Sequence, residues 1–110
     1  MNEIERRFYE RVCHFIEHFH GSEDVFLHGC CYWFAFILRE RFGGSIMYDP
    51  VAGHFMIMIG TRLFDVRGDV TDQYDLQRMD SIEMLQSTEP NLYGSLMRCC
   101  RYFEEVEDDG

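Results

Sequence analysis

The fold is decided by the central stretch of the chain, which from residue 29 to residue 66 reads GCCYWFAFILRERFGGSIMYDPVAGHFMIMIGTRLFDV. Residues 30–42 are apolar on almost every side at their start, which predicts a buried central helix ending at Gly43 and Gly44. Three extended runs follow, at residues 45–48, 54–59 and 63–66. Because the intervening turns are too short for parallel crossovers, we expect an antiparallel sheet.

A helix is predicted before this stretch, over residues 2–20, with Gly21 at its end. Its apolar side chains recur at helical spacing on one face. They are Ile4, Phe8, Val12, Phe15 and Phe19. Residues 22–29, SEDVFLHG, then predict a loop, or a loop with one helical turn, that leads into the central helix.

Two more helices are predicted after the sheet. Residues 67–79 are polar and predict a loop, and residues 81–86 predict a short helix with Ser81 near its cap. Residues 89–103 predict a final helix with Pro90 in its first turn. Its predicted apolar face consists of Leu92, Leu96, Cys99, Cys100 and Phe103. The fold class is therefore α+β, with a central helix and flanking helices packed on one side of a small antiparallel sheet of about three strands.

Length and composition predict one ordered domain over residues 1–103. The chain has 110 residues, of which 46% are hydrophobic, which is typical of a globular domain and excludes disorder as the main state. The last seven residues, EEVEDDG, hold five of the twenty acidic residues. We therefore expect residues 104–110 to form an acidic, frayed tail.

The charge balance excludes one class of partner. The formal net charge is −10, all ten basic residues are arginine, and there is no lysine. A protein that binds the phosphate backbone needs a basic surface, so no direct nucleic-acid binding is expected. No apolar run approaches the length of a membrane span, and the first residues, MNEIERRFYERV, lack the apolar core of a signal peptide. These features predict a cytoplasmic protein without a membrane partner.

The cysteines do not predict a disulfide framework. There are five, an odd number, including the adjacent pairs 30–31 and 99–100. In an intracellular protein most of them are expected to be small buried hydrophobes, with at most one or two in chemical use.

Three residues on the central stretch have the order that thiol catalysis requires. Cys31 stands at the start of the central helix, where free N–H groups and the helix dipole favour a thiolate. His54 opens the second strand and Asp65 lies on the third. An imidazole can act as the base for a thiol, and a carboxylate can orient that imidazole. Asp65 reaches His54 only with a register offset or on a diagonal, and Asp69 is the competing carboxylate.

The residues from Gly29 to Ala35, GCCYWFA, with Leu38 and Gly43–Gly44 after them, resemble the Gly-x-Cys-x-x-Phe-Ala signature of transglutaminase-like, papain-type proteins. The resemblance covers about residues 28–72. It implies Cys31 as nucleophile, His54 as base and Asp65 as the residue that orients the base. It favours Cys31 over Cys30, because Phe34-Ala35 begins three residues after Cys31.

The sequence departs from that pattern in two ways. The separations are short, with 23 residues from Cys31 to His54 and 11 from His54 to Asp65. Phe55 also stands where the family has tryptophan. The candidate donors to an oxyanion are the backbone N–H of Cys31 and the side chain of His28.

Each of these residues also has a structural interpretation. Cys30 and Cys31 can pack as core residues, His54 can bond a turn carbonyl, and Asp65 can face solvent by strand alternation. His14, Glu17 and His18 match an H-x-x-E-H metalloprotease pattern, but a chain of this size leaves little room for a third ligand and a cleft. No metal and no cofactor are therefore predicted. Arg67-Gly68-Asp69 is interpreted as a turn.

Two hypotheses of different classes remain. The first is a thiol-dependent acyl hydrolase or transferase acting on a protein or peptide substrate, as a peptidase, deamidase or amide transferase. The alternative is a non-enzymatic, acidic inhibitor of the phage or mobile-element type, similar to anti-CRISPR proteins. Such an inhibitor would occupy the basic cleft of a nucleic-acid-handling protein. An oligomerising protein with exposed aromatic side chains is a third possibility.

Overall fold

A computed structural model describes residues 2–19 and 31–98 of the chain. In these ranges helix α1 spans Glu3–Glu17, α3 spans Cys31–Phe42 and α4 spans Ile82–Thr88. The strands are β1 (Ser45–Asp49), β2 (His54–Ile59), β3 (Arg62–Asp65), β4 (Gly68–Asp69) and β5 (Asp80–Ser81). Short 3-10 helices occupy Thr71–Gln73 (η1) and Leu76–Arg78 (η2), and residues 90–98 are helical as well.

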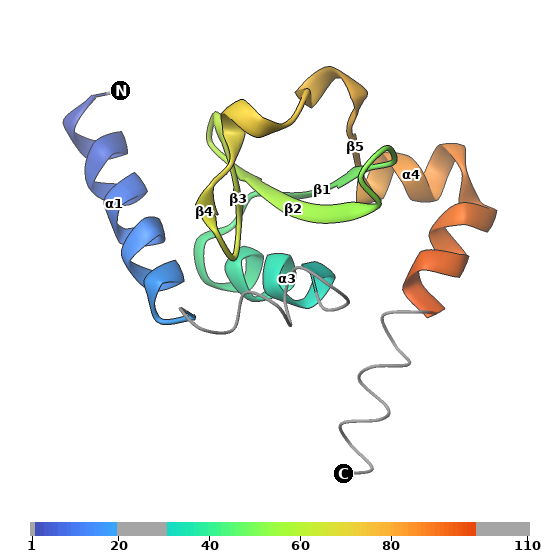
Figure 1. The fold of residues 1–110 in the computed structure, drawn as a ribbon, viewed down its shortest axis with the longest axis horizontal. Coiled ribbons are helices and arrows are strands. Elements are labelled where there is room, and N and C mark those ends of the chain that lie inside the picture. Colours follow the sequence, from blue (N-terminus) through green and yellow to red (C-terminus); the bar gives the residue numbers. More distant parts are fainter. Residues whose placement is uncertain (1, 20–30, 99–110) are drawn as a thin grey trace, which may run out of the picture.

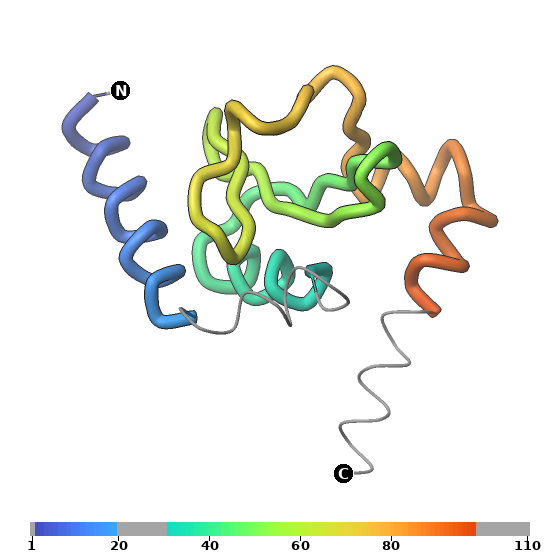
Figure 2. Tube along the Cα trace, in the orientation of Figure 1, coloured from blue at the N-terminus to red at the C-terminus, as the bar shows by residue number. Residues whose placement is uncertain are grey.

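The strands of this described part form one antiparallel sheet in the order β4-β3-β2-β1-β5. Helix α3 covers one face of the sheet, and the segment between β4 and β5 crosses the opposite face (Figure 1). In the trace, α1 and α4 lie at opposite ends of the sheet (Figure 2). The α+β class is confirmed, but the expected sheet of about three strands is an undercount. The two additional strands have only two residues each, too few to show alternation.

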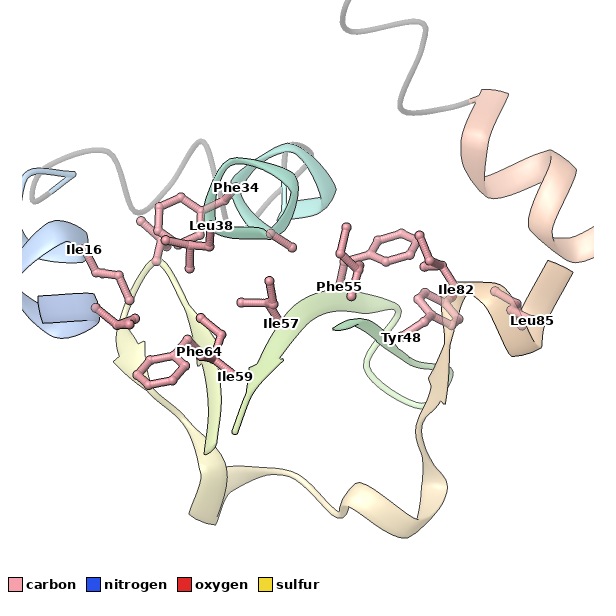
Figure 3. Packing of buried hydrophobic residues seen from close by; sticks show 14 residues of the cluster. Ile16, Phe34, Leu38, Tyr48, Phe55, Ile57, Ile59, Phe64, Ile82 and Leu85 are labelled. Carbon is pink, nitrogen blue, oxygen red and sulfur yellow. The ribbon is translucent and has the colours of Figure 1, made fainter. Parts of the chain in front are cut away.

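Alternation of side chains places two apolar clusters on the two faces of the sheet. On the α3 side, Phe34 and Leu38 meet Ile57 of β2, with Phe64 beside them (Figure 3). The cluster on the opposite face consists of Met47, Met56, Leu63, Val70 and Met79, with Met58 and Tyr74 packed against it. A helix on one face and a loop on the other therefore bury the central strands on both sides. This explains the nearly continuous apolar run of β2.

The predicted outer helices are correct in position but not in every contact. Helix α1 begins with Asn2 as its cap, because the Asn2 side chain accepts a hydrogen bond from the Glu5 N–H. Val12 is buried as expected, whereas Ile4 is 80% exposed. Ser81 caps α4 as predicted, by accepting the N–H of Met84. No helix in the described residues is long and apolar enough to cross a membrane.

The final helix is observed over residues 90–98, and the rest of its predicted span lies outside the described residues. Leu96 packs against the core as expected, but Leu92 is 37% exposed. Tyr93 and Met97 contact the core in its place. The predicted apolar face is thus wrong in part, because the helix turns the side with Tyr93 and Met97 toward the core cluster instead of the side with Leu92. Cys99, Cys100 and Phe103 lie outside the described residues, as do Gly21 and Cys30.

Two adjacent glycines between α3 and β1 give a direct test of this packing. Both have positive φ, at 80° for Gly43 and 102° for Gly44. A Cβ atom on Gly44 would lie 2.4 Å from the carbonyl oxygen of Met58, whereas one on Gly43 would meet nothing within 4 Å. Only Gly44 is therefore constrained by both its backbone conformation and its neighbour.

We expect Gly43→Ala to lower the free energy of unfolding by about 1 kcal/mol, which is the cost of a left-handed alanine. Gly44→Ala should lower it by about 2 kcal/mol more, because the β1–β2 ladder must also shift. Urea unfolding followed by circular dichroism measures both variants. Equal losses of stability would contradict the close approach of Gly44 to Met58.

Candidate functional site

The Cys31 thiol lies where the first turn of α3 meets the beginning of β2. Cys31 is the first residue of the helix, and its Sγ accepts a hydrogen bond from the backbone N–H of Phe55 at 3.5 Å. Phe55 directly follows His54, so this contact fixes the sulfur beside the beginning of β2, the strand that carries the imidazole. The cysteine is partly buried and is not in a disulfide. Helix and strand thus bring together two residues 23 positions apart.

A hydrogen bond joins His54 and Asp65 across neighbouring strands. His54 Nε2 lies 3.0 Å from Asp65 Oδ2, and the two residues are only 6% and 3% exposed. Ile57 is paired with Phe64 in the β2–β3 ladder, so Asp65 stands opposite Met56, on the diagonal from His54. Side chains on such a diagonal can reach one another. Of the two arrangements that the sequence allows, the structure therefore shows the diagonal one.

The three groups change one another's pKa. Burial would raise the pKa of the Cys31 thiol, but the neighbouring His54 and the N–H of Phe55 outweigh it, so the pKa lies below its ordinary value. Burial would lower the pKa of His54, but the bond to Asp65 and the nearby thiol raise it to about 9. A lowered thiol pKa beside a raised imidazole pKa favours a thiolate next to an imidazolium.

Asp65 is held ionised from two sides. Burial alone would raise its pKa, but His54 and the Arg67 side chain and backbone donate to it, so the pKa is lowered. The Arg67 backbone N–H donates to Oδ1 at 2.8 Å, and its guanidinium donates to both carboxylate oxygens. The carboxylate is therefore an acceptor only, as an orienting residue must be.

Asp69, the competing carboxylate, is engaged elsewhere. Its oxygens accept bonds from Tyr9 of α1, Arg62 of β3 and Thr71, all between 2.6 and 3.0 Å. Burial would raise the pKa of Asp69, but these donors lower it to about 2. Asp69 thus joins α1 to the sheet edge and leaves Asp65 as the partner of His54.

The other candidate groups do not form a site in the described residues. His14 lies 3.7 Å from Glu17, and its ring is in contact with that of His18 on an exposed helix face. No group of three metal-ligating side chains is found within residues 2–19 and 31–98. Burial raises the pKa of the Cys13 thiol, which is the opposite of the direction at Cys31. His28 lies outside the described residues.

Two residues of the site were missed in the sequence. The sequence predicts only a turn at Arg67, and the structure places this residue in the tight β3–β4 connection. The sequence predicts a polar loop around Tyr74, but in the structure the Tyr74 ring stacks on that of His54 with centroids 6.1 Å apart. Only the spacing of Arg67, two residues after an aspartate in an apolar strand, could have indicated a role in the site.

Comparison with known proteins identifies a family. A family model described as Phage YunG-like protein matches residues 8–94, which is most of the chain. No curated protein and no solved structure matches. The expected membership of the transglutaminase-like, papain-type superfamily is wrong, because the matching model is that of a phage protein family. The short cysteine-centred signature is also compatible with an unrelated helix that begins in an apolar core.

The contact between His54 and Asp65 can be tested against Asp69 as a matched control. In Asp65→Asn we expect the His54 pKa to fall from about 9 by one pH unit or more, because the imidazolium loses its anionic partner. In Asp69→Asn it should not change, since Asp69 bonds other residues. An NMR titration of the histidine ring measures both. A fall of the same size in both variants would contradict the assigned contact.

Proposed function

The chain belongs to the Phage YunG-like family, and we propose that it carries out thiol-dependent acyl chemistry at Cys31, His54 and Asp65. The observation that carries the proposal is the buried His54–Asp65 bond of 3.0 Å beside a thiol at a helix start. Free cysteines are commonly inert core residues. Here the thiol pKa is lowered despite burial, which an inert core cysteine would not require.

In the proposed reaction Cys31 is the nucleophile, His54 is the base and then the acid, and Asp65 supports His54. The Cys31 proton passes to the ring nitrogen of His54 that Asp65 does not engage, and Sγ then attacks the carbonyl carbon of an ester or amide. As the carbonyl–heteroatom bond breaks, the imidazolium returns the proton to the leaving alcohol or amine. Asp65 keeps the imidazole oriented and stabilises its charged form.

The thioester left on Cys31 is released by water or by an amine. His54 takes a proton from the incoming nucleophile, the nucleophile forms the new acyl bond, and the Cys31 thiolate leaves. With water the result is hydrolysis, or deamidation if the substrate is a glutamine side chain. With an amine it is transfer. Because this sequence contains no lysine, an ε-amine acceptor must come from another molecule.

We expect iodoacetamide at pH 6.5 to alkylate Cys31 roughly tenfold faster than Cys13, because only the thiolate reacts. p-Nitrophenyl acetate should release one equivalent of nitrophenol in a burst and leave an acetyl group on Cys31, as seen by mass spectrometry. Cys31→Ala should abolish both signals.

The controls are Cys13→Ala and Cys30→Ala, which should retain both signals. Loss of the burst in His54→Ala, with Cys31 still present, would agree with the role of the imidazole as base. Equal alkylation of Cys31 and Cys13 at pH 6.5, or a burst that survives Cys31→Ala, would refute the proposal.

A second function is favoured by a different observation. The family is a phage family, and the chain combines a net charge of −10 with five acids in its last seven residues. These features agree with an acidic inhibitor that occupies the basic cleft of a nucleic-acid-handling protein. Such binding requires no thiol chemistry.

For this second function, removal of residues 104–110 halves the net charge to −5, since the remaining fifteen acids face ten arginines. The full chain should displace a fluorescent oligonucleotide from a purified basic nucleic-acid-binding protein more strongly than the shortened chain does. Raising the salt from 50 to 500 mM, about a threefold reduction in screening length, should diminish that difference. The Cys31→Ala variant should act like the wild type. If displacement of the oligonucleotide depends neither on residues 104–110 nor on the salt concentration, that result would count against inhibition by electrostatic binding.

A further inference from the structure

Four side chains form a closed ring around the base of the candidate site. His54 bonds Asp65 at 3.0 Å, and Asp65 Oδ2 also accepts a bond from Arg67 Nη2. The same Nη2 donates to the Tyr74 hydroxyl at 2.7 Å, and the Tyr74 ring stacks on His54 at an interplanar angle of 27°. Each member is thus held by two others. The ring links β2, β3, the β3–β4 turn and the segment between η1 and η2.

We propose that Arg67 and Tyr74 are positioning residues of this site: Arg67 orients the Asp65 carboxylate, and Tyr74 holds both the guanidinium and the plane of the imidazole. This inference extends the proposed function from three residues to five. It rests on that function for its catalytic consequence. Arg67 and Tyr74 act through Asp65 and His54, and neither is assigned a contact with substrate.

The contacts of Arg67 distinguish it from an ordinary surface ion pair. An exposed ion pair is typically joined by one flexible hydrogen bond and contributes little to the stability of the fold. Arg67 instead contacts a carboxylate that is 3% exposed, through its backbone N–H, its Nε and its Nη2. A planar guanidinium that donates from two nitrogens restricts rotation of the carboxylate, which a lysine ammonium cannot do. The oxygen nearest to His54 is therefore kept in place.

The charge of Arg67 has a second effect, on the basicity of His54. Among the described residues, the titratable or charged groups that face His54 are Cys31 at the start of α3, its ladder partner Asp49 of β1, Asp65 of β3, and Arg67 and Tyr74, which contact Asp65 and the imidazole ring respectively. Only Arg67 is a permanent cation. Because it shares Asp65 with the imidazolium, it offsets part of the attraction that favours protonation of His54. The pH at which His54 loses its proton, and the thiolate–imidazolium pair with it, is therefore lower than it would be with Asp65 alone.

Arg62 provides a matched control in the same sheet. It donates to Asp69 through its Nε at 2.8 Å, and its side chain is 34% exposed against 35% for Arg67. Arg62→Gln therefore removes an equivalent ion pair from the neighbouring carboxylate without touching Asp65. Arg67→Lys provides the conservative variant, since it keeps the charge and loses the planar fork.

The experiment is a 15N NMR titration of His54 in the full chain. Arg67→Gln should raise the His54 pKa by about one pH unit, because a nearby cation is lost. Arg67→Lys and Arg62→Gln should leave it near the wild-type value. Tyr74→Phe should raise it by a smaller amount, because the guanidinium loses its hydroxyl anchor and moves toward solvent. The neutral ring should carry its proton on Nε2 in the wild type and become a mixture of tautomers in Arg67→Lys.

An unchanged or lowered His54 pKa in Arg67→Gln, or an equal rise in Arg62→Gln, would overturn the electrostatic effect of Arg67 on His54. A neutral His54 ring that keeps its proton on Nε2 alone in Arg67→Lys would overturn the positioning role of Arg67. An unchanged pKa in Tyr74→Phe would overturn that of Tyr74. The titration is repeated in Cys31→Ala, where thiol chemistry cannot occur, and the rise caused by Arg67→Gln should remain. The positioning roles can thus hold even if p-nitrophenyl acetate gives no burst, and that failure would count against the proposed function alone.

Discussion

The arrangement of the site depends on one constraint: the Asp65 carboxylate lies in an apolar strand and must be neutralised there. At 3% exposure an unpaired carboxylate would be costly, since burial removes its hydration without replacing it. The described structure supplies a His54 ring on the adjacent strand and an Arg67 guanidinium in the following turn. The β2–β3 register and the tight β3–β4 connection are both needed to deliver these partners. The electrostatic requirement of the Asp65 carboxylate therefore also fixes the local backbone geometry of the site.

Sequence periodicity was sufficient for the central elements. The apolar run of α3 and the alternation and turn residues of β1 to β3 place these elements within a residue or two of the observed bounds. Counting residues through the turn leaves open whether a register offset or a diagonal joins His54 to Asp65, and the observed β2–β3 register decides for the diagonal. The short strands β4 and β5 could not be predicted, because two residues carry no period and pair only after the neighbouring strands are in place.

Tertiary contacts determine which side chains are buried and which residues join the site, and local sequence patterns do not contain this information. Ile4 fits the apolar face of α1 by spacing, yet the beginning of that helix extends past the core and leaves it exposed. Tyr74 lies in a polar segment, and only the path of that segment across the sheet brings its ring onto His54. A short motif likewise could not identify the family of the chain. A glycine, a cysteine and an apolar helix start are each common, so their order specified local geometry without specifying ancestry.

The charges of the site explain how a buried group of ionisable residues can be tolerated. Asp65 and Arg67 cancel, and Cys31 and His54 hold one exchangeable proton between them. Moving that proton from sulfur to nitrogen creates a thiolate and an imidazolium but leaves the net charge unchanged. The ion pair carries a desolvation cost for both of its members. The mutual attraction of the two ions and their hydrogen bonds with Asp65 and the Phe55 N–H must offset that cost. A thiol whose pKa is lowered in spite of burial follows from this pairing, whereas an isolated buried cysteine would have its pKa raised, as Cys13 does.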